Sequence, residues 1–138
     1  MSKLHIKYTG GYKYQLKEDY IVQTDIITGK WIKTDFIELS PIGELIGKKG
    51  YAWDGASAIA IDTPSIMRPS LGHDIKYQLM RQCLIGQEWR DTADREMRKE
   101  CLEDGMSRIR AWWVYYGIRS AGDTFTDPKN KKEVFTAP

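Results

Sequence analysis

The sequence predicts an α+β protein in which an N-terminal antiparallel β-meander is followed by a block of three helices. Two observations support this class. Short runs of alternating apolar and polar residues occupy about residues 3–54, and apolar residues at helical spacing occupy about residues 65–121. A chain of 138 residues can bury a core in one domain without disulfides. We therefore expect a single domain over residues 1–122 and a C-terminal extension over residues 123–138.

The strand-like runs of the N-terminal part are short and follow one another closely. Gly10 and Gly11 separate the runs 4–8 and 12–16, and paired glycines at such a position favour a hairpin. Further runs lie at residues 20–27, 31–39, 44–46 and 51–53. The alternation within these runs is typical of an antiparallel sheet that buries one face.

Three helical segments are expected after the strands, at about residues 70–82, 88–104 and 107–120. The preceding stretch, residues 56–69, is expected to be a partly irregular connection with a short helical turn. Ser70 and Ser107 are suitable N-cap residues for the first and third helices. Gly86 marks the turn after the first helix, and Gly105 is a natural residue just past the end of the second.

Charge and hydropathy exclude several classes of protein. The 21 Lys and Arg residues and 19 Asp and Glu residues give a net charge of +2 and a pI of about 8.5. A nucleic-acid-binding domain usually has a pI above about 9 and clustered basic residues, so no specific nucleic acid is predicted as a partner. The longest apolar run, residues 111–118, is far shorter than the ~20 residues of a transmembrane helix. The N-terminal residues 1–11 lack the apolar segment of a secretion signal. We therefore expect a soluble protein of the cytosol.

The two cysteines, Cys83 and Cys101, indicate neither a metal site nor a disulfide. They lack the spacing of metal ligands. On two antiparallel helices they lie ~20 Å apart, too far for a disulfide bond. We expect both to be reduced thiols.

The strongest chemical signal is the segment His73-Asp-Ile-Lys-Tyr77 together with Asp94 on the next predicted helix. If the two helices are antiparallel about a turn near residues 84–85, His73 and Asp94 differ by only about 3 Å along the axis. A carboxylate bound to one ring nitrogen leaves the other nitrogen available as a base or ligand. Tyr77 lies one turn after His73 and can donate to the same carboxylate. His73, Asp94 and Tyr77 are therefore the candidate catalytic residues.

These residues also have a simpler interpretation. A helical histidine near a tyrosine and an acid can be a satisfied polar network that only joins two helices. Asp54, which precedes Gly55, can be an ordinary turn residue, and Arg81 and Arg119 are expected in ion pairs or in packing. The aromatic residues of the third helix are expected in the core and at interfaces rather than as a stacking platform. They are Trp112, Trp113, Tyr115 and Tyr116.

Four segments together resemble a family of small proteins of unassigned function that occurs mainly in tailed phages and prophages. The segments are residues 50–57, with Asp-Gly-Ala-Ser at the end, 73–81, with His-Asp-x-x-Tyr, 93–97, with Ala-Asp, and 110–122, rich in aromatic residues. Met97 stands where that family usually has an aromatic residue. The resemblance implies a phage protein of the host cytoplasm or the virion, with other phage structural proteins or a host protein as partners.

The His-Asp-x-x-Tyr helix followed by Asp94 is also similar to the helical hairpin of the phospholipase A2 group. That resemblance implies His73 as general base, Asp94 as its orienting acid and Tyr77 as the partner of Asp94. It implies calcium, which takes ~6–8 oxygen ligands, at Asp74. The calcium loop would come from residues 53–57 or 60–63, so Asp54 is a second candidate metal ligand. The candidates for contact with substrate or partner are Trp53, Ser57 and Arg81.

Two functions remain open. The chain can be a phage-encoded accessory protein that hydrolyses an ester, such as a lipid, with metal assistance. It can instead be a non-enzymatic virion, tail-associated or host-interacting protein whose polar cluster is structural. A metal phosphohydrolase fits less well, because only His5 is available as a second histidine ligand. A serine nucleophile fits less well too, because no nucleophile elbow surrounds Ser57 or Ser70.

Overall fold

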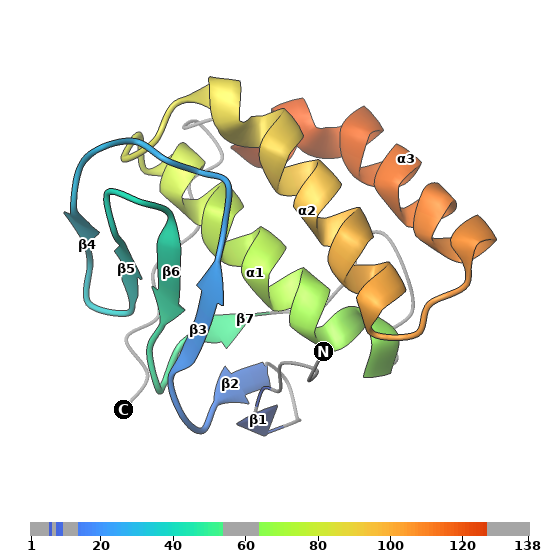
Figure 1. The fold of residues 1–138 in the computed structure, drawn as a ribbon, viewed down its shortest axis with the longest axis horizontal. Helices are drawn as coiled ribbons and strands as arrows, with labels where there is room; N and C mark the ends of the chain where they lie inside the picture. Colours follow the sequence, from blue (N-terminus) through green and yellow to red (C-terminus); the bar gives the residue numbers. More distant parts are fainter. Residues whose placement is uncertain (1–5, 7, 10–13, 54–63, 127–138) are drawn as a thin grey trace. The chain divides into compact units, whose positions relative to one another are not determined.

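The protein is described here by a computed structural model that places residues 6, 8–9, 14–53 and 64–126. The chain divides into two compact units by its contacts. Of the described residues, those up to Trp53 form the β unit and those from Pro64 to Thr126 form the helical unit. Antiparallel strands come first and three long helices follow, which confirms the α+β class (Figure 1). The single domain over 1–122 stays a prediction.

The β unit contains two small antiparallel sheets. The strands are β1 (Tyr8–Thr9), β2 (Tyr14–Leu16), β3 (Tyr20–Gln23), β4 (Ile32–Lys33), β5 (Ile37–Leu39), β6 (Glu44–Gly47) and β7 (Ala52–Trp53). One sheet has the order β1-β2-β7 and the other has the order β3-β6-β5-β4. Neighbours in sequence form the meander β4-β5-β6, whereas the pairs β2–β7 and β3–β6 join strands that lie far apart in the chain.

The alternation of side chains sets the register of the larger sheet. In β5, Ile37 and Leu39 are buried on either side of the half-buried Glu38. Leu39 is paired with the buried Leu45 of β6. A shift by one residue would turn this apolar set to the other face, so the burial pattern fixes the pairing.

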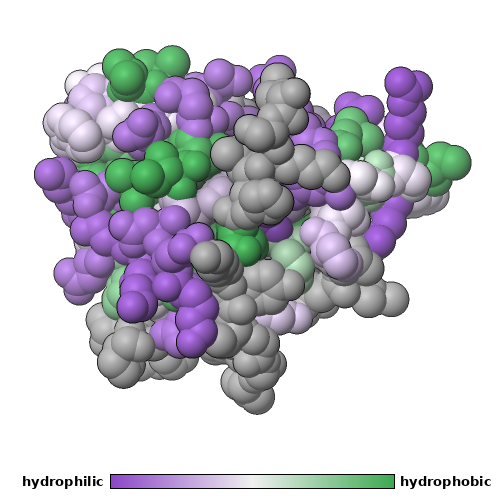
Figure 2. All heavy atoms as spheres, turned by 60° about the horizontal axis from the view of Figure 1, so that its bottom comes forward, coloured by the Kyte–Doolittle hydropathy of each residue, from purple (hydrophilic) through white to green (hydrophobic). Residues whose placement is uncertain are grey.

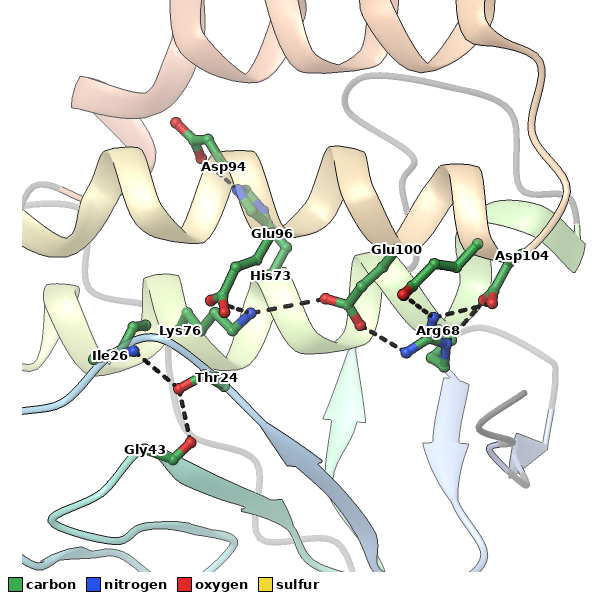
Figure 3. Close-up of polar contacts among 11 residues, drawn as sticks. Thr24, Ile26, Gly43, Arg68, His73, Lys76, Asp94, Glu96, Glu100 and Asp104 are labelled. Atoms are coloured by element: carbon green, nitrogen blue, oxygen red, sulfur yellow. Dashed lines mark hydrogen bonds and ion pairs between the residues drawn. The ribbon is translucent and has the colours of Figure 1, made fainter. Parts of the chain in front are cut away.

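A tight turn before β6 requires glycine at position 43. Gly43 has a φ of 91° and its carbonyl accepts hydrogen bonds from the amide and the hydroxyl of Thr24, both at 2.8 Å (Figure 3). A Cβ atom at this position would lie 2.5 Å from the Thr24 carbonyl oxygen. Only glycine meets both conditions without strain.

The helical unit consists of α1 (Pro64–Arg81), the short 3₁₀ helix η1 (Gln87–Trp89), α2 (Arg90–Glu103) and α3 (Arg108–Thr126). Helix α2 packs against both α1 and α3 (Figure 1). Each long helix contributes apolar side chains that are almost completely buried. They include Ile66, Leu71, Ile75 and Leu79 of α1, Ala93, Met97 and Cys101 of α2, and Ala111, Val114 and Ile118 of α3.

Helix α1 begins six residues earlier than the sequence suggested. Its first residue is Pro64, a favoured residue at that position because the missing N–H has no helical partner there. Pro69 lies inside the helix, and the Ser70 hydroxyl donates a hydrogen bond to the Met67 carbonyl at 2.9 Å. The prediction that Ser70 caps the helix is therefore wrong. Burial of the first turns, including Ile66, offsets the hydrogen bond that Pro69 cannot make.

Helices α1 and α2 end in the same way. Each is followed by a residue in the left-handed conformation, Cys83 with a φ of 59° and Gly105 with a φ of 98°. In both cases the next amide bonds to a carbonyl five residues earlier, which is the hydrogen bond of a Schellman motif. The prediction for Gly105 is confirmed. Cys83 was not predicted in this role, because a side chain is uncommon at such a position.

Helix α3 begins as predicted and continues further. The Ser107 hydroxyl accepts a hydrogen bond from the Arg110 amide at 3.2 Å, as an N-cap does. The helix runs to Thr126 rather than to about residue 120. The Thr126 side chain is buried and hydrogen-bonded to Gln87 at 2.7 Å, so packing against η1 stabilises its last turn.

The aromatic residues of α3 do not form the core of the helical unit. Trp112, Trp113 and Tyr116 are exposed, and Tyr115 is half-buried beneath the guanidinium of Arg98. The first three therefore lie outside the core, and their expected place at interfaces stays a prediction. The helix is oriented so that its small and aliphatic residues face α2, which leaves the large rings outside.

On the face drawn in Figure 2, hydrophobic side chains form separate groups among hydrophilic ones. Within residues 6, 8–9, 14–53 and 64–126, no helix is both long and apolar enough to cross a bilayer.

Candidate functional site

The predicted contact between His73 of α1 and Asp94 of α2 is present. The His73 Nε2 and Asp94 Oδ1 atoms are 2.7 Å apart, and Figure 3 shows the ring pointing toward the carboxylate. The His73 residue is 8% exposed and Asp94 is 0% exposed. The antiparallel register expected from the turn near residues 84–85 therefore brings the two groups together.

Asp94 joins all three long helices. Its Oδ1 atom also accepts a hydrogen bond from the Tyr77 hydroxyl at 2.5 Å, and its Oδ2 atom accepts one from Arg119 Nη1 of α3 at 2.9 Å. The rings of His73 and Tyr77 lie one helical turn apart, with centroids 3.9 Å from each other. We call these four residues the histidine cluster.

Asp94 carries a negative charge in this cluster. Burial alone raises the pKa of its carboxyl, but hydrogen bonds from His73, Tyr77 and Arg119 outweigh burial and hold the pKa below its ordinary value. Burial, followed by the hydrogen bond to Asp94, raises the pKa of Tyr77. Its hydroxyl therefore keeps its proton and remains a donor.

His73 is neutral at pH 7. Burial lowers the pKa of its ring, and this outweighs the opposing effect of Asp94, while the nearby Lys76 lowers it further. The ring nitrogen that faces an ionised carboxylate must be the protonated one, so we assign the hydrogen to Nε2. The lone pair then lies on Nδ1. No residue within the described ranges forms a hydrogen bond with Nδ1.

Arg119 is the member of the cluster that was not among the catalytic candidates. Arg119 was predicted to form an ion pair or to pack, and its ion pair with Asp94 confirms the first of these roles. It also lies 3.6 Å from the Asp91 carboxylate. A buried carboxylate needs a cationic or hydrogen-bonding partner, but nothing in the sequence indicates which residue of the third helix reaches Asp94.

A second polar group lies between α1 and α2, and the sequence did not reveal it. Arg68 bonds to Glu100 and Asp104 at 2.9 Å each and approaches Glu103 at 3.3 Å (Figure 3). Lys76 lies 3.0 Å from Glu96 and 3.8 Å from Glu100. Arg68, Lys76 and Glu100 are all buried. We call the six residues the ion-pair network. Arg68 was missed because its segment was expected to be an irregular connection.

The remaining site candidates do not join the histidine cluster within the described residues. Arg81 is buried at the end of α1, about 12 Å along the axis from His73. Trp53 belongs to β7 of the other unit, where its ring lies 5.6 Å from that of Tyr14. Asp54 and Ser57 lie outside the described residues.

The metal candidates are only partly described. Asp74 is half-buried on α1, whereas Asp54 and the loop segments 53–57 and 60–63 are mostly outside the described ranges. Among the residues that are placed, no group of three or more histidine, cysteine or acidic residues could hold a metal ion. The described part of the chain therefore does not assemble the oxygen ligands of a calcium site.

The two cysteines are not bonded to each other, as expected. Cys83 is exposed and Cys101 is buried. Burial raises the pKa of the Cys101 thiol to about 12. Cys101 is therefore a thiol at neutral pH and takes no part in nucleophilic chemistry.

No family model, curated protein or solved structure matches this chain. A neutral imidazole held by a carboxylate through Nε2 can accept a proton at Nδ1, and this is the chemistry that the cluster offers.

Proposed function

We propose that this chain is a phage-encoded accessory protein that hydrolyses an ester, with His73 as the general base. One observation carries the proposal. The His73 ring is neutral and donates its Nε2 hydrogen to Asp94, which leaves the Nδ1 lone pair without a partner among the described residues. The phage origin and the choice of an ester are supported only by the resemblances of the sequence.

The hydrolysis forms no covalent bond between the protein and the substrate. Nδ1 of His73 takes a proton from a water molecule as the water oxygen attacks the ester carbonyl. The imidazolium that forms is stabilised by the Asp94 carboxylate, and its proton then passes to the leaving alkoxide. General-base assistance of this kind contributes about 10²–10⁴-fold in rate. Tyr77 and Arg119 act as positioning residues, because they hold Asp94 ionised and fixed.

Calcium assistance is a separate part of the proposal. It is supported by the resemblance to the phospholipase A2 hairpin, which gives Asp74 as a ligand. Asp74 alone falls far short of the ~6–8 oxygens that calcium takes, so no step of the chemistry above passes through a metal. A calcium-dependent rise of the melting temperature that Asp74→Asn abolishes would support this part.

The test is hydrolysis of p-nitrophenyl butyrate and of a short-chain phosphatidylcholine, with and without calcium. The key variant is His73→Gln, because its amide N–H can still donate to Asp94 while it provides no base. His5→Gln is the matched control, since it removes the chain's other histidine. We expect His73→Gln to lose about 10²–10⁴-fold in rate and the control to lose none. Full activity of His73→Gln, or no hydrolysis of either ester by the wild type, would overturn the proposal.

The second candidate is a non-enzymatic virion, tail-associated or host-interacting protein. It is favoured by the complete burial of Asp94 and by its hydrogen bonds from α2 to the two other long helices. In this interpretation the histidine cluster has a structural role and only holds the helices together. His73→Ala then lowers the free energy of unfolding by about 1–3 kcal/mol, and the wild type hydrolyses no ester. Co-purification with phage particles or with a host protein would support this candidate.

A further inference from the structure

Helix α3 carries an exposed apolar surface directly opposite its buried face. Ile109 is 74% exposed, Trp112 44%, Trp113 63% and Tyr116 56%. At about 100° per residue these four side chains fall within an arc of roughly 100° on the helix. We call them the aromatic stripe. The buried residues of α3 lie on the other side of the helix, so the stripe points away from the core of the helical unit.

The rings of the stripe contact one another. Trp112 lies edge to face with Trp113 at 5.1 Å and stacks on Tyr116 at 5.2 Å between centroids. The stripe is therefore a continuous apolar surface rather than a set of isolated rings. Continuous exposed apolar surfaces of this kind mark interaction sites.

Positive charge flanks the stripe on both sides. Between residues 108 and 121, α3 contains Arg108, Arg110 and Arg119 and no acidic residue. On the helix, Arg110 lies on one side of the stripe, and Arg108 and Arg119 lie on the other. Arg119 is engaged with Asp94 and Arg110 is half-buried, so the exposed Arg108 is the cation that an incoming partner meets.

This arrangement disfavours a second copy of the chain as the partner. Antiparallel packing of two stripes would bring the arginines of one helix toward those of the other, with no carboxylate between residues 108 and 121 to pair with them. The stripe lies on α3, which is an outer helix of the unit (Figure 1). Tryptophan and tyrosine rings prefer the level of lipid headgroups, and arginines beside them pair with lipid phosphates.

We propose that the aromatic stripe binds an anionic lipid surface, with its rings at the headgroup level and Arg108 at the phosphates. A helix with apolar aromatics on one face and arginines at its margins lies in the plane of such a surface. This binding is separate from ester hydrolysis and does not rest on it.

The test is co-sedimentation of the full chain with vesicles, either phosphatidylcholine alone or phosphatidylcholine mixed with phosphatidylglycerol. Trp113→Ala is expected to weaken binding to the mixed vesicles by about ten-fold or more. Trp31→Ala is the matched control, because Trp31 is 60% exposed in the β unit. Arg108→Gln is expected to weaken binding by about five-fold. Lys49→Gln, which makes the same change of net charge at an exposed site of the β unit, is its control.

The expected pattern is strong binding to the mixed vesicles, weak binding to phosphatidylcholine and loss of binding only in the α3 variants. Three results would overturn the proposal. The wild type could fail to bind the mixed vesicles, Trp113→Ala could bind as well as Trp31→Ala, or light scattering could show a dimer that Trp113→Ala dissociates. Circular dichroism of each variant establishes that it is folded.

Discussion

The two polar groups between α1 and α2 differ in the charges that they bury. The ion-pair network holds two cations, Arg68 and Lys76, against three carboxylates of α2 and that of Asp104, which follows the helix. The histidine cluster holds one carboxylate, Asp94, against one cation from α3 and two neutral donors. Both groups link α1 to α2, but only the histidine cluster contains a side chain whose ordinary pKa lies near neutral pH.

This difference separates a structural role from a chemical one. The ion-pair network pairs the buried cations Arg68 and Lys76 with carboxylates of the next helix and its end, so we assign it the role of holding the helices together. In the histidine cluster, His73 is neutral because it is buried, and it can gain a proton during a reaction. We therefore expect changes in the network to affect stability alone and changes in the cluster to affect stability, pH dependence and activity.

The largest effect on stability is expected from Arg68→Ala. This change leaves the buried Glu100 and the nearby Asp104 without their shared cation, and such a loss typically costs about 3–5 kcal/mol. Urea unfolding measures it. Arg95→Ala is the control, because Arg95 is exposed and forms only a surface pair with Asp91. Equal stabilities of the two variants would contradict the structural role of the network.

A smaller loss is expected from Tyr77→Phe. The change removes the hydroxyl that donates to Asp94 but leaves the ring in place, and hydrogen bonds to charged groups contribute about 1.5–3 kcal/mol. Tyr116→Phe, at an exposed position, is the control and should leave the unfolding curve unchanged. If the two variants unfold alike, the Tyr77 hydroxyl does not contribute to the cluster.

The smallest effect concerns pH. Burial lowers the pKa of His73 in the folded state below the ordinary 6.5, so the unfolded chain binds this proton more readily. The stabilising contribution is complete above about pH 6.5 and is lost as pH falls below it. Asp94, whose folded pKa lies below 3.8, acts in the same direction only at lower pH.

We expect the free energy of unfolding to fall by about 1 kcal/mol between about pH 7.5 and pH 5.5. His73→Gln should abolish most of this dependence, and His5→Gln should leave it intact. A wild type that gains stability on acidification over this range would contradict the assignment of a neutral His73. Glu100 has a pKa that burial raises, so it opposes the trend, and the comparison of variants removes its contribution.

Local patterns in the sequence were sufficient for the order of elements and for the contact between His73 and Asp94. The spacing of apolar residues placed the helices, and the length of the turn set the register in which those two residues meet. Gly105 and Ser107 marked the boundary between α2 and α3 correctly, because a left-handed residue and an N-cap are requirements of the backbone close by.

The sequence was less informative where distant segments had to be matched. Residues 56–69 were expected to be a partly irregular connection, yet burial of the first turns of α1 extends the helix back to Pro64. The pairing of β3 with β6 was equally hidden, since alternation indicates that a strand has a buried face but not which strand lies beside it.

The sequence by itself determined that an imidazole, an aspartate and a tyrosine lie on adjoining turns of two neighbouring helices. Only the tertiary structure decided that Arg119 completes this group, that Arg68 and Lys76 form a second group beside it, and that Trp112 and Trp113 face outward. The physical reason is that helical periodicity depends on residues a few positions apart. The charge partner of a buried carboxylate and the rotation of a helix instead depend on how whole helices pack.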